Sequence, residues 1–384
     1  MKMYLILEYC FGGRFYQDLL SLLRHFKRPY PDVLFAAGSQ VDLQWVILAY
    51  ESSIKQGLRC AFVGPDLLVP QGADYYDTSM HMLRFYRAPL FVTATSGLTL
   101  ARMPRSSVRR VAILHSLVSL HMAYPVGTFN GYTDIFCCGQ HHVDEIEAMN
   151  SYYNIANRRP VLIGYGKLAR LSTIQSIASE SEVAGRHVLI GPSWGAGNIL
   201  EAIGGVLIAR LLAEGYQVTL RPHPSFFIIG DRLIDSLVAT YIGQPAFRLE
   251  SSIQESTALW TADFMISDYS GLAMEFALMR GKPVLYVNVP PKVLNPEWGV
   301  LGLAPLELSV REHIGVLVPP EVDAVIAGLA RLRNDPARWA VGITQVRERH
   351  WTNFGHFGEV CAEQFLLMLD EVQQSENIRP KAQR

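Results

Sequence analysis

The stretch Ala262–Val287, ADFMISDYSGLAMEFALMRGKPVLYV, decides the fold of this 384-residue chain. It predicts a short apolar strand that ends near Ser267 and a tight polar turn over Asp268–Gly271. A helix at about Leu272–Arg280 and a second strand at Pro283–Val287 follow. Where a strand enters a helix through such a turn, the first N–H groups of the helix lack intrahelical acceptors and lie at the positive end of its dipole. The stretch therefore predicts a parallel α/β sheet with an anion-binding site at its edge.

A second turn of the same character lies upstream. The strand Val218–Leu220 ends in the sequence RPHP at Arg221–Pro224, where two prolines fix the backbone around His223. The carboxyl ends of parallel strands share one edge of the sheet, where α/β folds bind ligands. We therefore expect His223, Ser270 and the N–H group of Gly271 to converge on a phosphate. The alternative is that His223 is only a turn residue.

Composition sets limits on the class of protein. The chain length suits two α/β domains, and 49% apolar residues allow a large core. Because 34 Lys and Arg residues balance 35 Asp and Glu residues, we expect no nucleic-acid partner. The five cysteines show no C-x-x-C spacing, so neither a disulfide framework nor a structural zinc site is expected. A reducing cytoplasm is the simpler location.

The N-terminal sequence bears on targeting and on cofactors. We predict a first strand at residues 3–8, then a turn at Gly12-Gly13 and an amphipathic helix at about Phe15–Phe26. The G-x-G-x-x-G spacing is absent, so no nicotinamide or other cofactor is expected. We expect no signal peptide, because the opening residues lack its long apolar core, and no membrane-spanning segment, because no run approaches about 18 apolar residues. The segment Arg24–Arg28, RHFKR, is either a solvated helix end or a contact to acidic lipid at the inner face of the cytoplasmic membrane.

Strand and helix patterns alternate through both halves of the chain, which predicts parallel sheets covered by helices. We predict a Rossmann-like acceptor domain at residues 1–175 and a Rossmann-like nucleotide-donor domain at residues 186–350, with a linker at 171–185. The tail at residues 351–384 contains an amphipathic helix, which we expect to pack back on the first domain.

Four segments of the second half carry a family resemblance. The sequences GPSW at 191–194, RPHP at 221–224, SDYSG at 267–271 and RGKPVLY at 280–286 together resemble the CDP-glycerol glycerophosphotransferase family of teichoic acid and capsule assembly. In the first half, the Trp-His-Gly-Thr-Pro segment of that family is matched only by Leu114-His115-Ser116. The resemblance implies a GT-B fold, in which two Rossmann-like domains present parallel sheets to a central cleft.

The resemblance also implies a donor site. His223, Ser270 and the Gly271 amide would hold the pyrophosphate of a cytidine nucleotide, and Arg221 would pair either with phosphate or with Asp268. A second reading of Asp268 is that it only caps its own turn.

Three further residues complete the predicted donor site. Glu275 would accept hydrogen bonds from the ribose hydroxyls, or else it is a solvated carboxylate on the helix. Ser193 and Trp194 would line the cytosine pocket or close over the phosphates, although a Trp beside a proline is as often plain packing.

An acceptor hydroxyl loses a proton as it attacks, so a base is needed. His115 ends a predicted first-domain strand and matches the catalytic histidine of the family; His121 is the second candidate. His141 and His142 are candidates for binding acceptor phosphate. No H-x-x-x-H or H-E-x-x-H spacing occurs, so no metal is expected.

These residues predict a transferase. It would move glycerophosphate or a related alditol phosphate from a CDP-activated donor to a hydroxyl of a growing cell-surface polysaccharide or lipid-linked glycan, and release CMP. The nearest alternative is a glycosyltransferase that uses a CMP-sugar (Kdo or sialic acid), with Asp231 or Glu145 as the carboxylate at the sugar carbon. A sugar-nucleotide epimerase and a nucleotide-binding protein without activity also fit these sequence features.

Overall fold

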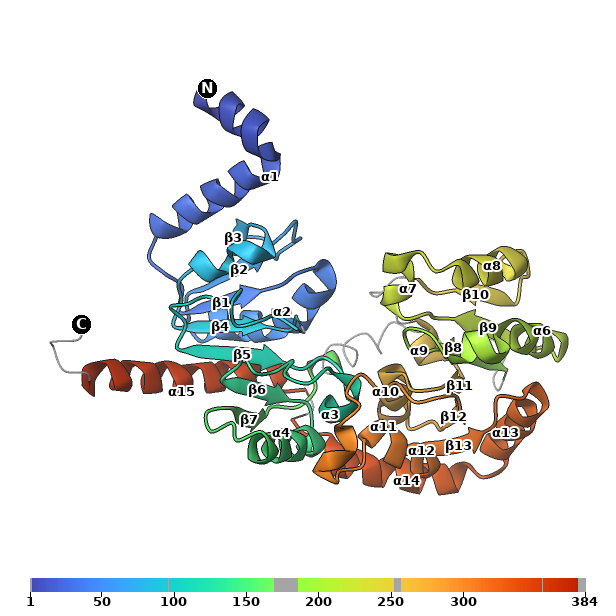
Figure 1. The fold of residues 1–384 in the computed structure, drawn as a ribbon. Coiled ribbons are helices and arrows are strands. Elements are labelled where there is room, and N and C mark those ends of the chain that lie inside the picture. The colour runs from blue at the N-terminus through green and yellow to red at the C-terminus, as the bar shows by residue number, and fades with distance from the viewer. Residues whose placement is uncertain (1, 96, 169–185, 252–256, 354, 379–384) are drawn as a thin grey trace. The chain divides into compact units, whose positions relative to one another are not determined.

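The computed structural model describes residues 2–95, 97–168, 186–251, 257–353 and 355–378 (Figure 1). The chain forms two compact units. Unit 1 comprises Met1–His115, Pro125–Ala169 and Thr352–Arg384, and unit 2 comprises Ser116–Tyr124 and Arg170–Trp351. The predicted linker at 171–185 lies outside the described residues. The described helices include none that combines the length and the low polarity needed to cross a membrane.

Unit 1 contains a seven-stranded parallel sheet in the order β3-β2-β1-β4-β5-β6-β7. The strands are β1 (Val33–Ala36), β2 (Cys60–Gly64), β3 (Asp74–Asp77), β4 (Leu90–Thr93), β5 (Arg109–Ile113), β6 (Asp134–Cys137) and β7 (Arg159–Leu162). The helices are α1 (Lys2–Phe26), α2 (Gln40–Lys55), η1 (Met80–Phe85), α4 (Gln140–Tyr152) and α15 (Phe357–Ile378). The central strands are buried along their length, as expected of a parallel sheet covered on both faces.

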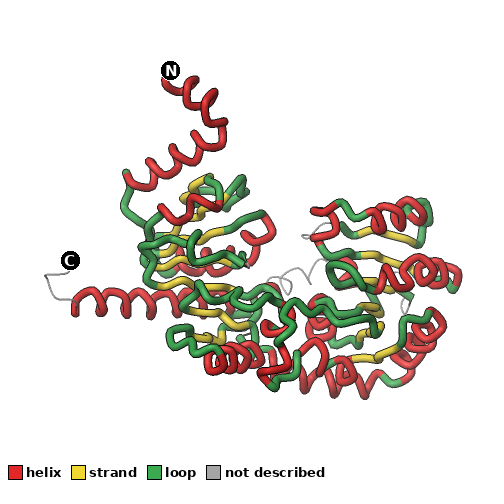
Figure 2. Tube along the Cα trace, in the orientation of Figure 1, coloured by secondary structure: helices red, strands yellow, loops and turns green. Residues whose placement is uncertain are grey.

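Unit 2 contains a six-stranded parallel sheet in the order β10-β9-β8-β11-β12-β13. The strands are β8 (His187–Gly191), β9 (Gln217–Leu220), β10 (Phe247–Leu249), β11 (Phe264–Ser267), β12 (Val284–Val287) and β13 (Gly315–Val318). The helices are α3 (Leu120–Ala123), η3 (Leu200–Gly204), α6 (Gly205–Ala213), α7 (Pro224–Ile229), α8 (Arg232–Tyr241), α9 (Thr257–Thr261), α10 (Gly271–Arg280), η4 (Trp298–Leu301), α11 (Leu306–Ser309), α12 (Arg311–Ile314), α13 (Val322–Asn334) and α14 (Pro336–His350). In unit 2, strands alternate with helices along the chain, whereas in the described part of unit 1 no helix separates β2 from β3 or β4 from β5 (Figure 2). The predicted α/β fold with two parallel sheets is confirmed.

The predicted first strand at residues 3–8 is wrong, because these residues belong to helix α1. Their Met, Leu and Glu residues favour a helix. Farther along α1, the carboxylate of Asp18 is buried and accepts hydrogen bonds from Ser79 N at 2.7 Å and Ser79 Oγ at 2.8 Å. Arg14 donates to Asp77, the last residue of β3, at 2.8 Å. The helix is therefore fixed beside β3, a strand that the sequence did not predict.

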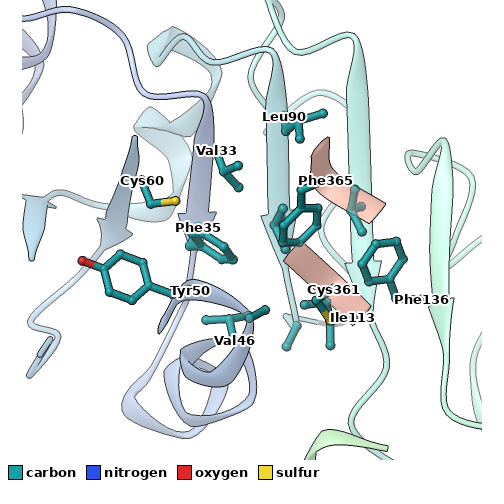
Figure 3. Packing of buried hydrophobic residues seen from close by; sticks show 14 of the residues in the cluster. Val33, Phe35, Val46, Tyr50, Cys60, Leu90, Ile113, Phe136, Cys361 and Phe365 are labelled. Carbon is teal, nitrogen blue, oxygen red and sulfur yellow. The ribbon is translucent and has the colours of Figure 1, made fainter. Parts of the chain in front are cut away.

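Helix α15 completes the core of unit 1. The ring of Phe365 is fully buried and lies 5.9 Å from the ring of Phe35 and 5.5 Å from that of Phe136 (Figure 3). Cys361, one turn earlier, is also fully buried. Each buried Phe contributes about 2–3 kcal/mol through the hydrophobic effect. The last helix is thus part of the core that holds β1, β4, β5 and β6 together.

Candidate functional site

The candidate site in unit 2 lies at the carboxyl edge of its sheet. Strands β9, β8, β11 and β12 are neighbours in that order and run parallel, so the turns that follow them open on the same edge. These turns carry His223 after β9, Ser193 after β8, Ser270 after β11 and Lys292 after β12. The sheet order therefore brings together the three turns that the sequence singled out, and it adds a fourth.

Asp268 fixes the geometry of this edge. Its carboxylate is fully buried and accepts three backbone hydrogen bonds, from Ser193 N at 2.6 Å, Tyr269 N at 2.7 Å and Ile199 N at 2.9 Å. It therefore joins the loop after β8 to the turn after β11, and does more than cap its own turn. Arg221 forms an ion pair with the buried carboxylate of Glu250, at 2.6 Å.

The N-terminus of α10 has the geometry of an anion-binding site. The Ser270 hydroxyl accepts from Leu272 N at 3.3 Å, and the Ser270 carbonyl accepts from Ala273 N at 3.0 Å. Gly271 is the first helical residue, so its N–H group has no acceptor within the helix. A Cβ atom at Gly271 would lie 2.9 Å from Ser116 Oγ, which means that a side chain here needs Ser116 to move. The predicted N–H donor therefore belongs to a position where the structure leaves little room for a side chain.

His223 is held in one orientation by its own turn. It is the N-cap of α7, and its Nδ1 accepts from Ser225 N at 3.2 Å and lies 2.8 Å from Ser225 Oγ. Since Nδ1 accepts a backbone N–H, the proton of the neutral ring lies on Nε2. The side chain is exposed to solvent.

Glu275 and Trp194 have different surroundings. Glu275 is 2% exposed on α10, so the alternative of a solvated helix carboxylate is wrong. Trp194 is half-buried in the loop after β8. Ser193, which precedes it, is 1% exposed, and among the residues described here its hydroxyl has no hydrogen-bond partner. Ser193 Oγ is thus a buried polar atom that could form a hydrogen bond with a ligand.

Lys292 was not singled out from the sequence. Its Nζ donates to the carbonyl oxygen of Ala196 in the loop after β8. Burial lowers its pKa, and the nearby carboxylates of Asp268 and Glu201 oppose that shift. The sequence did contain a signal for this residue, because Lys292 directly follows Pro290-Pro291 in the segment after a buried strand.

In unit 1, His115 follows β5 at the carboxyl edge of the sheet. Its ring stacks on the indole of Trp45, with centroids 6.1 Å apart and 11° between the planes. Its carbonyl oxygen accepts from the Tyr165 hydroxyl at 2.9 Å, and Lys167 Nζ lies 5.4 Å from the Trp45 centroid. Sequence reasoning missed Trp45 and Lys167, because only the fold places α2 and the segment after β7 beside β5.

The remaining predicted histidines are buried. His121 belongs to unit 2, is 1% exposed, and has Nε2 3.2 Å from the carbonyl oxygen of Leu303. The rings of His141 and His142 are 3.9 Å apart near the start of α4, and His142 Nδ1 accepts from Cys138 N at 3.4 Å. The described part of the chain holds no group of three or more His, Cys, Asp or Glu side chains that could bind a metal ion.

The two carboxylates considered for a sugar donor lie in different surroundings. Asp231 caps α8 by accepting from Leu233 N at 2.8 Å, and Glu145 is buried on α4.

Comparison with solved structures decides the fold family. A structure of the wall teichoic acid polymerase TagF with CDPG has a TM-score of 0.62 at 14% identity, and the match covers 96% of each chain. The chain has the GT-B fold. The UDP-GlcNAc 2-epimerase of Neisseria meningitidis bound to UDP-GlcNAc has a TM-score of 0.59 at 12% identity, over 87% of this chain and 99% of that chain. The UDP-GlcNAc 2-epimerase of Methanocaldococcus jannaschii with UDP-GlcNAc and UDP has a TM-score of 0.57 at 11% identity, over 88% and 99%. No protein-family model and no curated protein sequence matches the chain.

Proposed function

We propose that this GT-B protein is a transferase that moves glycerophosphate, or a related alditol phosphate, from a CDP-activated donor to a hydroxyl of a cell-surface polysaccharide or lipid-linked glycan. The observation that carries the proposal is the carboxyl edge of unit 2, where Asp268 fixes the Ser193 loop to the turn that presents Ser270 and Gly271. The wall teichoic acid polymerase structure with CDPG supports this donor class.

The donor phosphates would lie at the N-terminus of α10. The Gly271 N–H group and the helix dipole stabilise negative charge there, and His223 Nε2–H donates to the same anion. Glu275, farther along the same helix, would accept from the ribose hydroxyls. These contacts favour the departure of CMP, because negative charge grows on its phosphate as the bond breaks.

His115 is our proposed base. The acceptor oxygen forms a bond to the phosphorus that bears the glycerol, the bond from that phosphorus to the CMP oxygen breaks, and the hydroxyl proton passes to His115. Stacking on Trp45 restricts the plane of the imidazole, which a proton acceptor needs for a fixed approach. His121 is the less suitable candidate because its ring is buried.

Release of CMP tests the proposal. The purified chain is incubated with CDP-glycerol and a polyol-phosphate acceptor, and CMP is quantified. His115→Ala should lower the rate about 10²–10⁴-fold, as expected for loss of a general base. His223→Ala should weaken binding of CDP-glycerol. Tighter binding of UDP than of CDP in a calorimetric panel would contradict the cytidine donor.

An epimerase is the second candidate, since two structures with TM-scores near 0.6 are UDP-GlcNAc 2-epimerases. This reaction needs no acceptor. Conversion of UDP-GlcNAc by the chain alone, without CMP release from CDP-glycerol, would favour it. CMP-Kdo and CMP-sialic acid in the same CMP-release assay test the CMP-sugar alternative.

We also propose that unit 1 contacts the membrane peripherally. On α1 the apolar side chains of Phe15, Leu20, Leu23 and Phe26 are exposed, and the segment Arg24–Arg28 adds basic groups at the end of the helix. Co-sedimentation with vesicles that contain acidic lipid, but not with neutral vesicles, is the expected result. Equal recovery from both would leave only a solvated helix end.

A further inference from the structure

The loop after β12 brings a lysine to the proposed donor site. Lys292 lies five residues beyond Val287, the last residue of β12, and its Nζ donates to the carbonyl oxygen of Ala196 in the loop after β8. The side chain is partly buried, and the carboxylates of Asp268 and Glu201 are near enough to act on its charge. Lys292 is therefore a cation beside the loop that carries Ser193.

The hydrogen bonding of Lys292 is incomplete. An ammonium group has three donors, and in the described part of the chain the Ala196 carbonyl is its one hydrogen-bond acceptor. A neutral carbonyl compensates poorly for the partial burial of a charge, and this burial lowers the pKa of the lysine. A phosphate oxygen would supply both the missing acceptor and the opposite charge.

The loop that Lys292 contacts has other tethers. Asn198 Nδ2 donates to the Gly195 carbonyl at 2.8 Å, and Gly197 N donates to Glu201 Oε2 at 2.6 Å. Asp268 holds both ends of the loop, through Ser193 N and Ile199 N. The hydrogen bond from Lys292 is therefore not needed to define the conformation of this loop, which favours a role toward a ligand.

We propose that Lys292 binds the second phosphate of the donor and so makes the site select nucleoside diphosphates over monophosphates. This inference rests on the proposed function. There, Glu275 holds the ribose and the N-terminus of the same helix, at Ser270 and Gly271, holds the phosphate attached to it. The next phosphate then needs a group from a different element. The loop after β12, the neighbour of β11 in the sheet, supplies Lys292.

The second phosphate is also the one that is transferred. In the proposed reaction its phosphorus is attacked by the acceptor hydroxyl, and its oxygens carry charge in the transition state. Lys292 would neutralise that charge without forming or breaking a bond.

Calorimetric titration of the full chain with CMP and with CDP tests the inference. Lys292→Ala should weaken CDP binding about 10- to 100-fold, as expected for one charge-assisted hydrogen bond, and CMP binding less than about threefold. Lys292→Arg keeps the charge and should retain most of the CDP affinity.

Lys282→Ala is the matched control. Lys282 Nζ also donates to a backbone carbonyl, that of Ala262 at 3.1 Å, and also lies beside a carboxylate, Asp263 at 3.5 Å. It precedes β12, so it is at the opposite edge of the same sheet. This variant should leave the ratio of CMP to CDP affinity unchanged.

Each outcome of the titration decides the inference. Equal weakening of CMP and CDP by Lys292→Ala, or no weakening of either, would refute it and leave the donor-site proposal standing. A wild-type chain that binds neither nucleotide would refute both. A loss of binding accompanied by a fall in melting temperature in Lys292→Ala and in Lys292→Arg would mean that the lysine only supports the loop.

Discussion

Replacing Asp268 by Asn tests whether one buried carboxylate organises the unit 2 site. The variant keeps the size of the side chain and exchanges one carboxylate oxygen for an NH₂ group. The remaining oxygen can still accept from Ser193 N and Tyr269 N, as Oδ1 does in the native protein. The NH₂ group then faces Ile199 N, whose acceptor is Oδ2 at 2.9 Å. A donor therefore meets a donor in a fully buried position.

The expected cost follows from this exchange. A hydrogen bond to a charged group contributes about 1.5–3 kcal/mol, and a buried N–H group without a partner costs about 1–3 kcal/mol. The two terms overlap, so we expect Asp268→Asn to destabilise unit 2 by about 3 kcal/mol. For a unit of this size, that corresponds to a fall in melting temperature of about 6–12 °C. Because the Ile199 end of the loop after β8 loses its hydrogen bond to residue 268, CDP affinity should fall as well.

Differential scanning calorimetry and nucleotide titration measure both effects, and Asp231→Asn is the matched control. Asp231 caps α8 by accepting one backbone N–H, from Leu233 at 2.8 Å, and Asn is an equally good N-cap. The control should change stability by less than about 0.5 kcal/mol. Native melting temperature and native CDP affinity in Asp268→Asn would refute the organising role of the carboxylate.

Three further predictions concern packing, charge and pH. Asp134→Ala should destabilise unit 1 by about 2–3 kcal/mol in denaturant titration, because it removes a fully buried carboxylate that pairs with Arg159 at 2.8 Å. The control is Glu371→Ala, at a half-exposed partner of the same arginine, which should lower the free energy of unfolding by less than about 1 kcal/mol. Equal losses in the two variants would contradict this reasoning. Burial lowers the pKa of His25 to about 4, so below pH 6.5 the unfolded chain takes up a proton that the folded chain does not. The free energy of unfolding should therefore fall toward pH 4 by up to about 3 kcal/mol. His25→Gln should flatten that part of the plot of stability against pH, and an unchanged plot would exclude His25 as its cause. Gly271→Ala should weaken CDP binding, because the Cβ of the new alanine would lie 2.9 Å from Ser116 Oγ. If this contact is the reason, the double variant with Gly271→Ala and Ser116→Gly should regain part of the affinity for CDP.

The sequence predicts best where local signals agree. The stretch at 262–287 gives β11, α10 and β12 with boundaries within one residue of those in the structure at most ends. Apolar runs of strand length are interrupted there by a turn rich in small polar residues, and Gly281 ends the helix with φ 64°. Each signal acts over a few residues, so no distant contact is needed to read it.

Prediction fails where the environment decides. Residues 3–8 form a short apolar run, which periodicity cannot assign to a strand or a helix, and they are helical. The strand β3, DYYD at 74–77, has two Asp residues and was not predicted; it pairs only with β2 at the edge of the sheet. The RPHP turn leads directly into a short helix, α7, which the sequence did not predict, and Gly230, with φ 66°, separates α7 from α8.

The candidate site shows the same division. Ser193, His223 and Ser270 can be found from the sequence because each follows a strand in a recognisable turn. Lys292 acquires its significance only from the contact with Ala196, 96 positions earlier in the chain. The hydrogen-bond pattern of Asp268 likewise depends on the pairing of β11 with β8. Such contacts are set by strand order, which no local pattern contains.

The segment after His115 shows how residues from the two halves of the sequence come together within one unit. Ser116 directly follows the proposed base, yet it belongs to unit 2 and occupies the space that a side chain at Gly271 would need. Three residues later, Ser119 N and Ser119 Oγ both donate to the buried carboxylate of Glu307, at 2.8 Å each. This segment is therefore anchored in unit 2, which carries the proposed anion-binding site. Gly271 in the SDYSG turn and Ser116 after His115 compete for the same space. We therefore expect the effect of a substitution at either position to depend on the residue at the other.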